Sequence, residues 1–275
     1  MEFLWHGMDM EAKVKETRMI ARYFKQLHDR GSFGVIGSLY FREDLLDRKV
    51  RTVPTTDNKF VIGPTVTASM FVGGMKLRLP RNLGPYSDDG EYMTALLDAE
   101  VEDMRFLQSL EAYTYVEFDQ DLAQEAPEIA DGLRNLQEAR QTLFPSPPRH
   151  PPRQFTLSHR DLSLSNIFVD PATHDITGIV DWECAGTRPL WEKRYPAFLK
   201  GREIEEKPEP LSPGVKDWED WEKVVLRRSW DEELGHVDHE DDITDKKRLD
   251  WKGQLDVLEA YVEQVVGEKS KGTKL

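Results

Sequence analysis

The stretch that decides the fold is Leu157-Ser158-His159-Arg160-Asp161-Leu162-Ser163-Leu164-Ser165-Asn166-Ile167-Phe168-Val169-Asp170, followed by Ile179-Val180-Asp181-Trp182-Glu183. A strand that ends near Ser158 would deliver Asp161 to a loop. The sequence then predicts a short buried strand at 167–169, a turn at 170–175 and a returning strand at 176–180. This hairpin would carry Asp181 back towards Asn166.

These residues form the pattern H-R-D-x-x-x-x-N with a downstream Asp, which indicates phosphotransfer chemistry. In that chemistry Asp161 orients an acceptor hydroxyl and takes its proton, and His159 braces the loop. Asn166 and Asp181 are the predicted magnesium ligands, because Mg²⁺ prefers oxygen donors and substrate phosphates. The alternative interpretation is a polar turn beside a hairpin, without chemistry. Glu183 is expected to cap a turn, with metal binding as its alternative.

The two motifs resemble the aminoglycoside phosphotransferase and choline kinase-like family, in which Trp-Glu follows the metal-binding Asp. Other segments are similar to a fungal branch of that family: Ile36–Phe41, Phe60–Pro64, Gly84–Tyr86 and Pro189–Glu192. The resemblance extends to about Gly201. Arg160 stands where the antibiotic-modifying relatives usually have Gly.

The resemblance implies an α+β, protein kinase-like fold: a mainly α-helical C-terminal lobe with a small β-hairpin at the catalytic loop. Residues 1–275 are expected to form this single lobe, with the N-terminal lobe absent. Residues 1–7 resemble the hinge between lobes, where Glu2 is a predicted cofactor-binding residue with Asn166 and Asp181. Residues 145–152 are a predicted Pro-rich connector, and 202–275 the closing helices.

The implied function is ATP- and magnesium-dependent transfer of the terminal phosphate to a small-molecule hydroxyl. Activity of this chain alone is expected to be weak or absent, because the phosphate-covering glycine-rich loop and its Lys are missing. A non-catalytic kinase-like binding domain is the alternative. Aminoglycoside, choline-like, sugar and protein hydroxyls all remain open as acceptors. Association through the exposed face where the other lobe would dock is also expected.

One glycine-rich segment, Gly31–Val35, is not interpreted as a phosphate loop, because the preceding residues have helical periodicity. Met10, Val14, Thr17, Ala21, Phe24 and Leu27 follow this spacing, with Asp9 as the predicted N-cap and Gly31 as the C-cap. Further helices are predicted at 92–107, 122–143, 190–199, 218–234 and 246–266.

The composition argues against two classes of binding partner. A net charge of −14 is unfavourable for binding nucleic acid and anionic membranes. The single Cys184 and the lack of a signal-like N-terminus predict a cytoplasmic setting.

Cys184 is interpreted as a small buried thiol and the cluster at 236–242 as a solvated acidic loop. Trp218, Trp221 and Trp230 are expected to pack on the lobe, with an acceptor pocket as the alternative.

Overall fold

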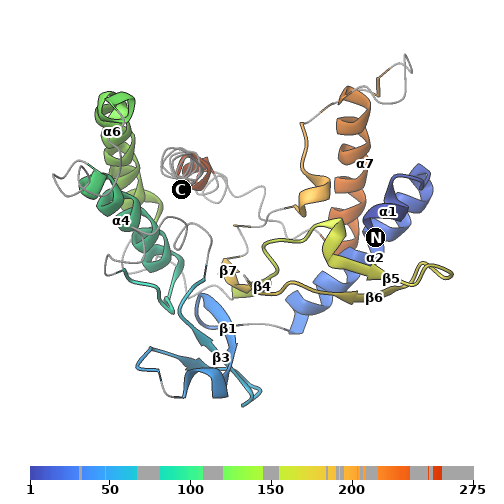
Figure 1. The fold of residues 1–275 in the computed structure, drawn as a ribbon, viewed down its shortest axis with the longest axis horizontal. Helices are drawn as coiled ribbons and strands as arrows, with labels where there is room; N and C mark the ends of the chain where they lie inside the picture. Colours follow the sequence, from blue (N-terminus) through green and yellow to red (C-terminus); the bar gives the residue numbers. More distant parts are fainter. Residues whose placement is uncertain are drawn as a thin grey trace, which may run out of the picture. The chain divides into compact units, whose positions relative to one another are not determined.

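Helices and antiparallel strands make up the described chain, which agrees with the expected α+β composition (Figure 1). The computed structural model describes residues 1–30, 33–46, 48–66, 81–107, 120–144, 155–183, 185–189, 192, 195–202, 204, 207–208, 216–235, 247 and 250–255. The chain divides into two compact units. The first unit comprises Met1–Ser32, Thr156–Ala185 and Glu192–His239; the second comprises Phe33–Phe155, Gly186–Trp191 and Glu240–Leu275. The single-domain organisation stays a prediction.

The first unit is built on α2 (Met10–Arg30), which confirms the predicted helix. The Ala12 amide donates to Asp9 Oδ1 at 2.8 Å, so Asp9 satisfies one of the free N–H groups of the first turn, as expected of an N-cap. Ile20, Ala21 and Phe24 are buried on one face. Because the helix continues to Arg30, no strand leads into the glycine-rich segment that follows it.

The second long helix of this unit, α7 (Lys216–Leu234), packs along α2 (Figure 1). Its buried apolar side chains are Val224, Leu226, Trp230 and Leu234. Three ion pairs join the two helices: Lys13–Glu222 at 3.0 Å, Arg18–Glu232 at 2.7 Å and Arg22–Glu233 at 2.7 Å. The pairs of Arg18 and Arg22 are open to solvent and contribute at most about 1 kcal/mol each, so apolar burial dominates this contact.

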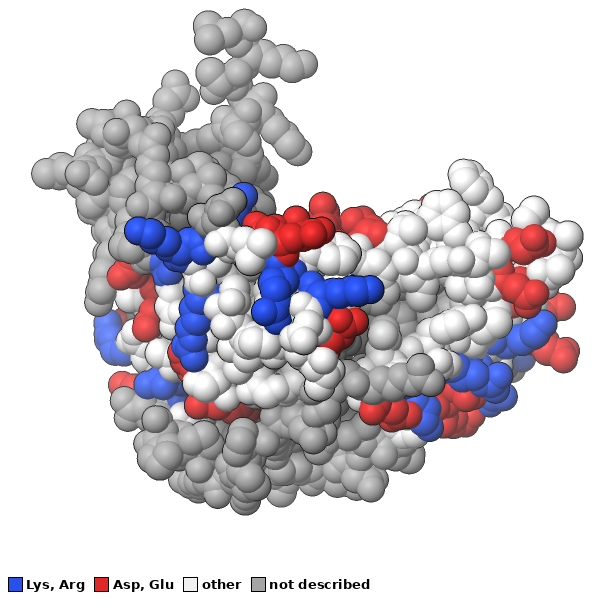
Figure 2. All heavy atoms as spheres, turned by 90° about the horizontal axis from the view of Figure 1, so that it is seen from below, with Lys and Arg blue, Asp and Glu red and all other residues white. Residues whose placement is uncertain are grey.

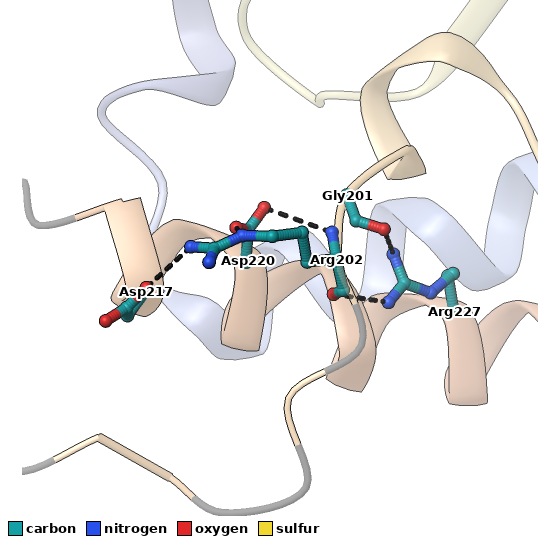
Figure 3. Close-up of polar contacts among 5 residues, drawn as sticks. All are labelled: Gly201, Arg202, Asp217, Asp220 and Arg227. Atoms are coloured by element: carbon teal, nitrogen blue, oxygen red, sulfur yellow. Dashed lines mark hydrogen bonds and ion pairs between the residues drawn. The ribbon is translucent and has the colours of Figure 1, made fainter.

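A polar network fixes the chain that precedes α7. Figure 3 shows the Arg202 side chain between Asp217 and Asp220, at 2.6 and 2.8 Å. In the same view Arg227 reaches back from α7 and donates to the carbonyl oxygen of Arg202 at 3.1 Å, and it also donates to that of Leu199 at 2.8 Å. Arg227 is buried, so its donors satisfy carbonyl groups that water does not reach freely.

The predicted hairpin is present as β5 (Ile167–Val169) and β6 (Ile176–Ile179), which pair antiparallel. Asp170 builds the turn: its Oδ1 accepts from the amides of Ala172 at 2.8 Å and Thr173 at 2.9 Å. These bonds hold the pKa of Asp170 below its ordinary value. The strand is not buried throughout, because Ile167 is buried whereas Phe168 is 54% exposed. Alternate side chains of a strand face opposite sides, and only one side of β5 is covered.

The prediction of a helix at 190–199 is wrong for the residues that the structure describes there. Tyr195 and Pro196 are not helical, and only a 3₁₀ turn, η4 (Ala197–Leu199), follows them. Pro196 has no N–H to donate to a preceding turn, so a continuous helix through it would lose a hydrogen bond. Leu199 is fully buried in the core of the first unit.

The second unit contains a sheet in which β2 (Val53–Pro54), β3 (Phe60–Gly63), β1 (Gly37–Phe41) and β7 (Gly186–Pro189) are neighbours in that order. A 3₁₀ turn, η1 (Arg42–Leu45), follows β1. β1 and β7 approach closely where Gly186 faces the Gly37 carbonyl oxygen. A Cβ at Gly186 would lie 2.7 Å from that oxygen, so a side chain would force the strands apart.

Two predicted helices complete the second unit: α4 (Asp89–Leu107) and α6 (Gln120–Leu143). Asp88 caps α4, since its Oδ1 accepts from the Glu91 amide at 2.8 Å. The core gathers Tyr92 and Leu97 from α4, Leu136 from α6, and Trp251 from the short described part of the helix predicted at 246–266. The Trp251 indole donates to the Leu136 carbonyl oxygen at 2.8 Å.

Acidic and basic side chains lie next to one another on the described surface that Figure 2 shows. Among the described helices, none has the length and apolarity needed to cross a membrane.

Candidate active site

The candidate catalytic loop lies between β4 (Phe155–Ser158) and the hairpin, and buried side chains of its own anchor it to the core. His159, Leu162 and Ile167 are 1%, 6% and 1% exposed, whereas Asp161 is exposed. A 3₁₀ turn, η2 (Leu164–Asn166), returns the chain towards the hairpin. Burial of these side chains fixes the loop and leaves the Asp161 carboxylate accessible.

The structure brings together the three residues that the sequence singled out. Asn166 Nδ2 donates to the Asp161 carbonyl oxygen at 2.9 Å and to Asp181 Oδ2 at 3.3 Å. The two aspartates are thereby held on either side of one amide group. All three residues belong to the first unit.

Three hydrogen bonds fix the backbone of the two residues that precede Asp181. The Val180 amide donates to the Asn166 carbonyl oxygen at 3.0 Å. His159 Nε2 donates to the Val180 carbonyl oxygen at 2.8 Å, and the Trp182 indole donates to the Ile179 carbonyl oxygen at 2.8 Å. The role predicted for His159 thus has a structural counterpart: its imidazole ties the catalytic loop to the strand that carries Asp181.

Arg160 and Asp181 share an unusual backbone conformation, with φ of 67° at each. This left-handed region costs a residue with a Cβ about 1–2 kcal/mol, and such strain persists where the surroundings enforce it. Position 160 is also where the sequence departs from the Gly of the antibiotic-modifying relatives. The conformation gives that Gly a physical reason, because glycine adopts positive φ without steric cost.

The side chains at this site fit a magnesium ion. Asn166 uses its amide nitrogen towards the two aspartates, which leaves its amide oxygen as a possible ligand beside the exposed Asp181 carboxylate. Magnesium is usually held by one or two carboxylates together with substrate phosphates and water. Within the described residues no group of three His, Cys, Asp or Glu side chains forms a metal cluster.

A comparison with protein families gives independent information on the same segment. Residues 90–193 match the model of the phosphotransferase enzyme family. The resemblance inferred from the sequence is confirmed over this segment, which contains Asp161, Asn166 and Asp181. The matched family implies a protein kinase-like fold, with which the helices and antiparallel strands are compatible. No curated protein and no solved structure matches the chain. The fungal branch and the restriction to one lobe stay predictions.

Other predicted site residues have different surroundings. Glu2 is exposed on α1 (Glu2–Trp5), a single helical turn that contacts η2, the turn that ends at Asn166. Its role as a nucleotide ligand stays a prediction. Glu183 is exposed after Trp182. Cys184, Gly31, the connector at 145–152 and the cluster at 236–242 lie outside the described residues.

The three tryptophans of α7 divide into two groups. Trp230 is buried in the core, as expected. Trp218 and Trp221 are only half-buried, with ring centroids 5.3 Å apart, and the Lys207 ammonium lies 5.3 and 5.1 Å from them. This pair therefore does not pack into the core of the unit as fully as the sequence predicted.

The sequence does not indicate that Phe24 contacts Trp182, and it presents Trp182 only as part of a motif. Phe24 follows the helical spacing of core residues, which gave no sign that its ring faces Trp182. The contact between the buried Phe24 ring of α2 and the Trp182 ring, which follows Asp181, is visible only in the tertiary structure.

A separate cavity of about 500 Å³ lies in the second unit between α4 and the end of α6. Its charged lining includes Asp98, Glu102 and Arg140, and Arg140 donates to Thr94 Oγ1 at 2.8 Å. None of the three converging residues of the first unit lines it.

Proposed function

We propose that this chain is an ATP- and magnesium-dependent phosphotransferase that acts on a small-molecule hydroxyl. The observation that carries the proposal is the hydrogen-bonded grouping of Asp161, Asn166 and Asp181. The family match of residues 90–193 supports the reaction class. The acceptor class, ATP and magnesium are parts of the proposal.

In this proposal each side chain has one task. Asp161 accepts the proton of the acceptor hydroxyl, for which its exposed carboxylate is accessible. Asn166 and Asp181 would hold the magnesium ion. When bound, that ion would neutralise charge on the phosphates and orient the terminal phosphoryl group. His159 positions the strand that precedes Asp181 through its bond to Val180.

The hydrogen bonds within this grouping favour a catalytic role over the alternative of a polar turn without chemistry. Asn166 binds the backbone of the proposed base residue and the side chain of the proposed metal ligand at once. Because phosphoryl transfer depends largely on positioning and electrostatic stabilisation, a shared anchor for both aspartates is useful to it.

The proposal is tested by magnesium-dependent ATP binding, measured by calorimetry on the wild-type chain and on Asp181→Asn. Wild-type protein should bind ATP more tightly with magnesium than with EDTA, and Asp181→Asn should lose most of that difference. Asp175→Asn, an exposed aspartate in the hairpin turn, is the matched control. Absence of magnesium-dependent binding by the wild type would overturn the proposal. Binding without any phosphate transfer to hydroxyl acceptors would favour the non-catalytic binding domain.

A further inference from the structure

A column of aromatic rings runs through the first unit and ends at the candidate site. Trp230 of α7 contacts Phe24 of α2, with ring centroids 5.8 Å apart. Phe24 stacks against Trp182 at 6.5 Å and an interplanar angle of 17°, and Trp182 contacts His159 at 4.5 Å. Trp230, Phe24 and His159 are 4%, 7% and 1% exposed, so the column is largely shielded from water.

The column meets the backbone at the strained residue. Trp182 follows Asp181, whose φ is 67°, and its indole donates back to Ile179. His159, at the end of the column, holds the Val180 carbonyl oxygen. Two rings of the column thus bond to the two residues that precede Asp181. An aspartate with positive φ needs such support from its neighbours, because without it the backbone would relax to a negative φ.

We propose that Phe24 is a positioning residue for Asp181 that acts through the indole ring of Trp182. Phe24 lies on α2, outside the catalytic loop and the hairpin. Among the described residues its ring contacts are those with Trp182 and Trp230. Its effect on phosphate transfer would therefore be indirect: it limits movement of Trp182 and so keeps Asp181 beside Asn166. The part of this inference that concerns metal binding rests on the proposed function.

The first test measures amide hydrogen exchange without metal or nucleotide. Phe24→Leu should speed exchange of the Val180 amide, which bonds to Asn166, by roughly three- to tenfold. Phe144→Leu is the matched control. Phe144 is another buried phenylalanine that contacts a tryptophan, Trp251, at 5.4 Å, but it belongs to the second unit. Phe24→Tyr keeps the ring and should exchange like the wild type.

The second test titrates Mn²⁺ into each protein in the presence of ATP, followed by electron paramagnetic resonance. Phe24→Leu should bind Mn²⁺ roughly tenfold more weakly, as is typical when support behind a metal ligand is removed. Phe144→Leu should stay within about twofold of the wild type. If Phe24→Leu does not fold, Phe24→Met, whose longer and more flexible side chain adapts better to the space left by the ring, replaces it with the same expectation.

The two readouts separate the two proposals. Wild-type exchange at Val180 in Phe24→Leu, or equal acceleration in Phe144→Leu, would overturn the positioning role whatever the protein binds. A wild-type protein without Mn²⁺·ATP binding would instead overturn the proposed function, while faster exchange in Phe24→Leu would still support the column.

Discussion

Asn166 Nδ2 lies 3.3 Å from Asp181 Oδ2, although fifteen positions separate these residues in the chain. The hairpin makes this approach possible, because β5 starts at the residue after Asn166 and β6 ends two residues before Asp181. The pairing Ile167↔Ile179 sets the two ends side by side. The register of one short hairpin therefore determines whether the candidate site exists.

Asp161→Asn should remove the proton acceptor and preserve the shape of the site. In a preparation that transfers phosphate, turnover should fall by roughly two to four orders of magnitude, measured by coupled ADP release. Magnesium-dependent ATP binding should change little, because the Asp161 contact to Asn166 uses its backbone carbonyl. Unchanged turnover would refute the assignment of Asp161 as the base.

Two substitutions at Arg160 test the backbone strain, since both remove the same side chain. Arg160→Gly should be more stable than Arg160→Val by about 1–2 kcal/mol, because valine is a poor fit to φ of 67°. Chemical denaturation of both variants gives the difference. Equal stability would mean that the left-handed conformation at this position costs little.

Glu16 should make the stability of the first unit depend on pH. Its side chain is 2% exposed, its Oε2 has no hydrogen-bond partner among the described residues, and burial raises its pKa. Lys15 and His174 oppose this rise, and Asp175 adds to it. Because the folded pKa lies above the unfolded value of about 4.3, the stabilising contribution is complete below that value and is lost as pH rises through the folded pKa.

Glu16→Gln should abolish this loss. The melting temperature of the variant, relative to that of the wild type, should therefore rise as pH increases from about 4 to 7. Glu11→Gln, an exposed position on the same helix, is the control and should follow the wild-type profile. A constant difference between Glu16→Gln and wild type across this range would contradict the prediction.

Arg227→Met should destabilise the protein by about 2–3 kcal/mol, because it leaves the carbonyl groups of Leu199 and Arg202 without their buried donors. Arg228→Met, at the adjacent exposed position of α7, should change stability by less than about 0.5 kcal/mol. Urea denaturation of the two variants provides the comparison. Equal effects would show that the network in Figure 3 contributes little to folding.

Local signals predicted much of the fold. The helix at 10–30 followed from apolar spacing and the Asp9 cap, and the hairpin followed from two β-branched runs around an Asp-Pro turn. Interactions between near neighbours control these elements, so a short window of sequence contains the needed information. The helix expected at 190–199 failed because that window includes Pro196, whose effect outweighs the apolar spacing.

The sequence by itself determined which groups could carry the chemistry: His159, Asp161, Asn166 and Asp181 stand in an order that specifies a loop and a hairpin. Only the tertiary structure decided that the rings of Phe24 and Trp230 line up with Trp182 beside that site and that Arg160 and Asp181 adopt positive φ. The physical reason is the range of the interactions. Turns and strands respond to adjacent residues, whereas ring contacts and backbone strain depend on which distant helices pack together.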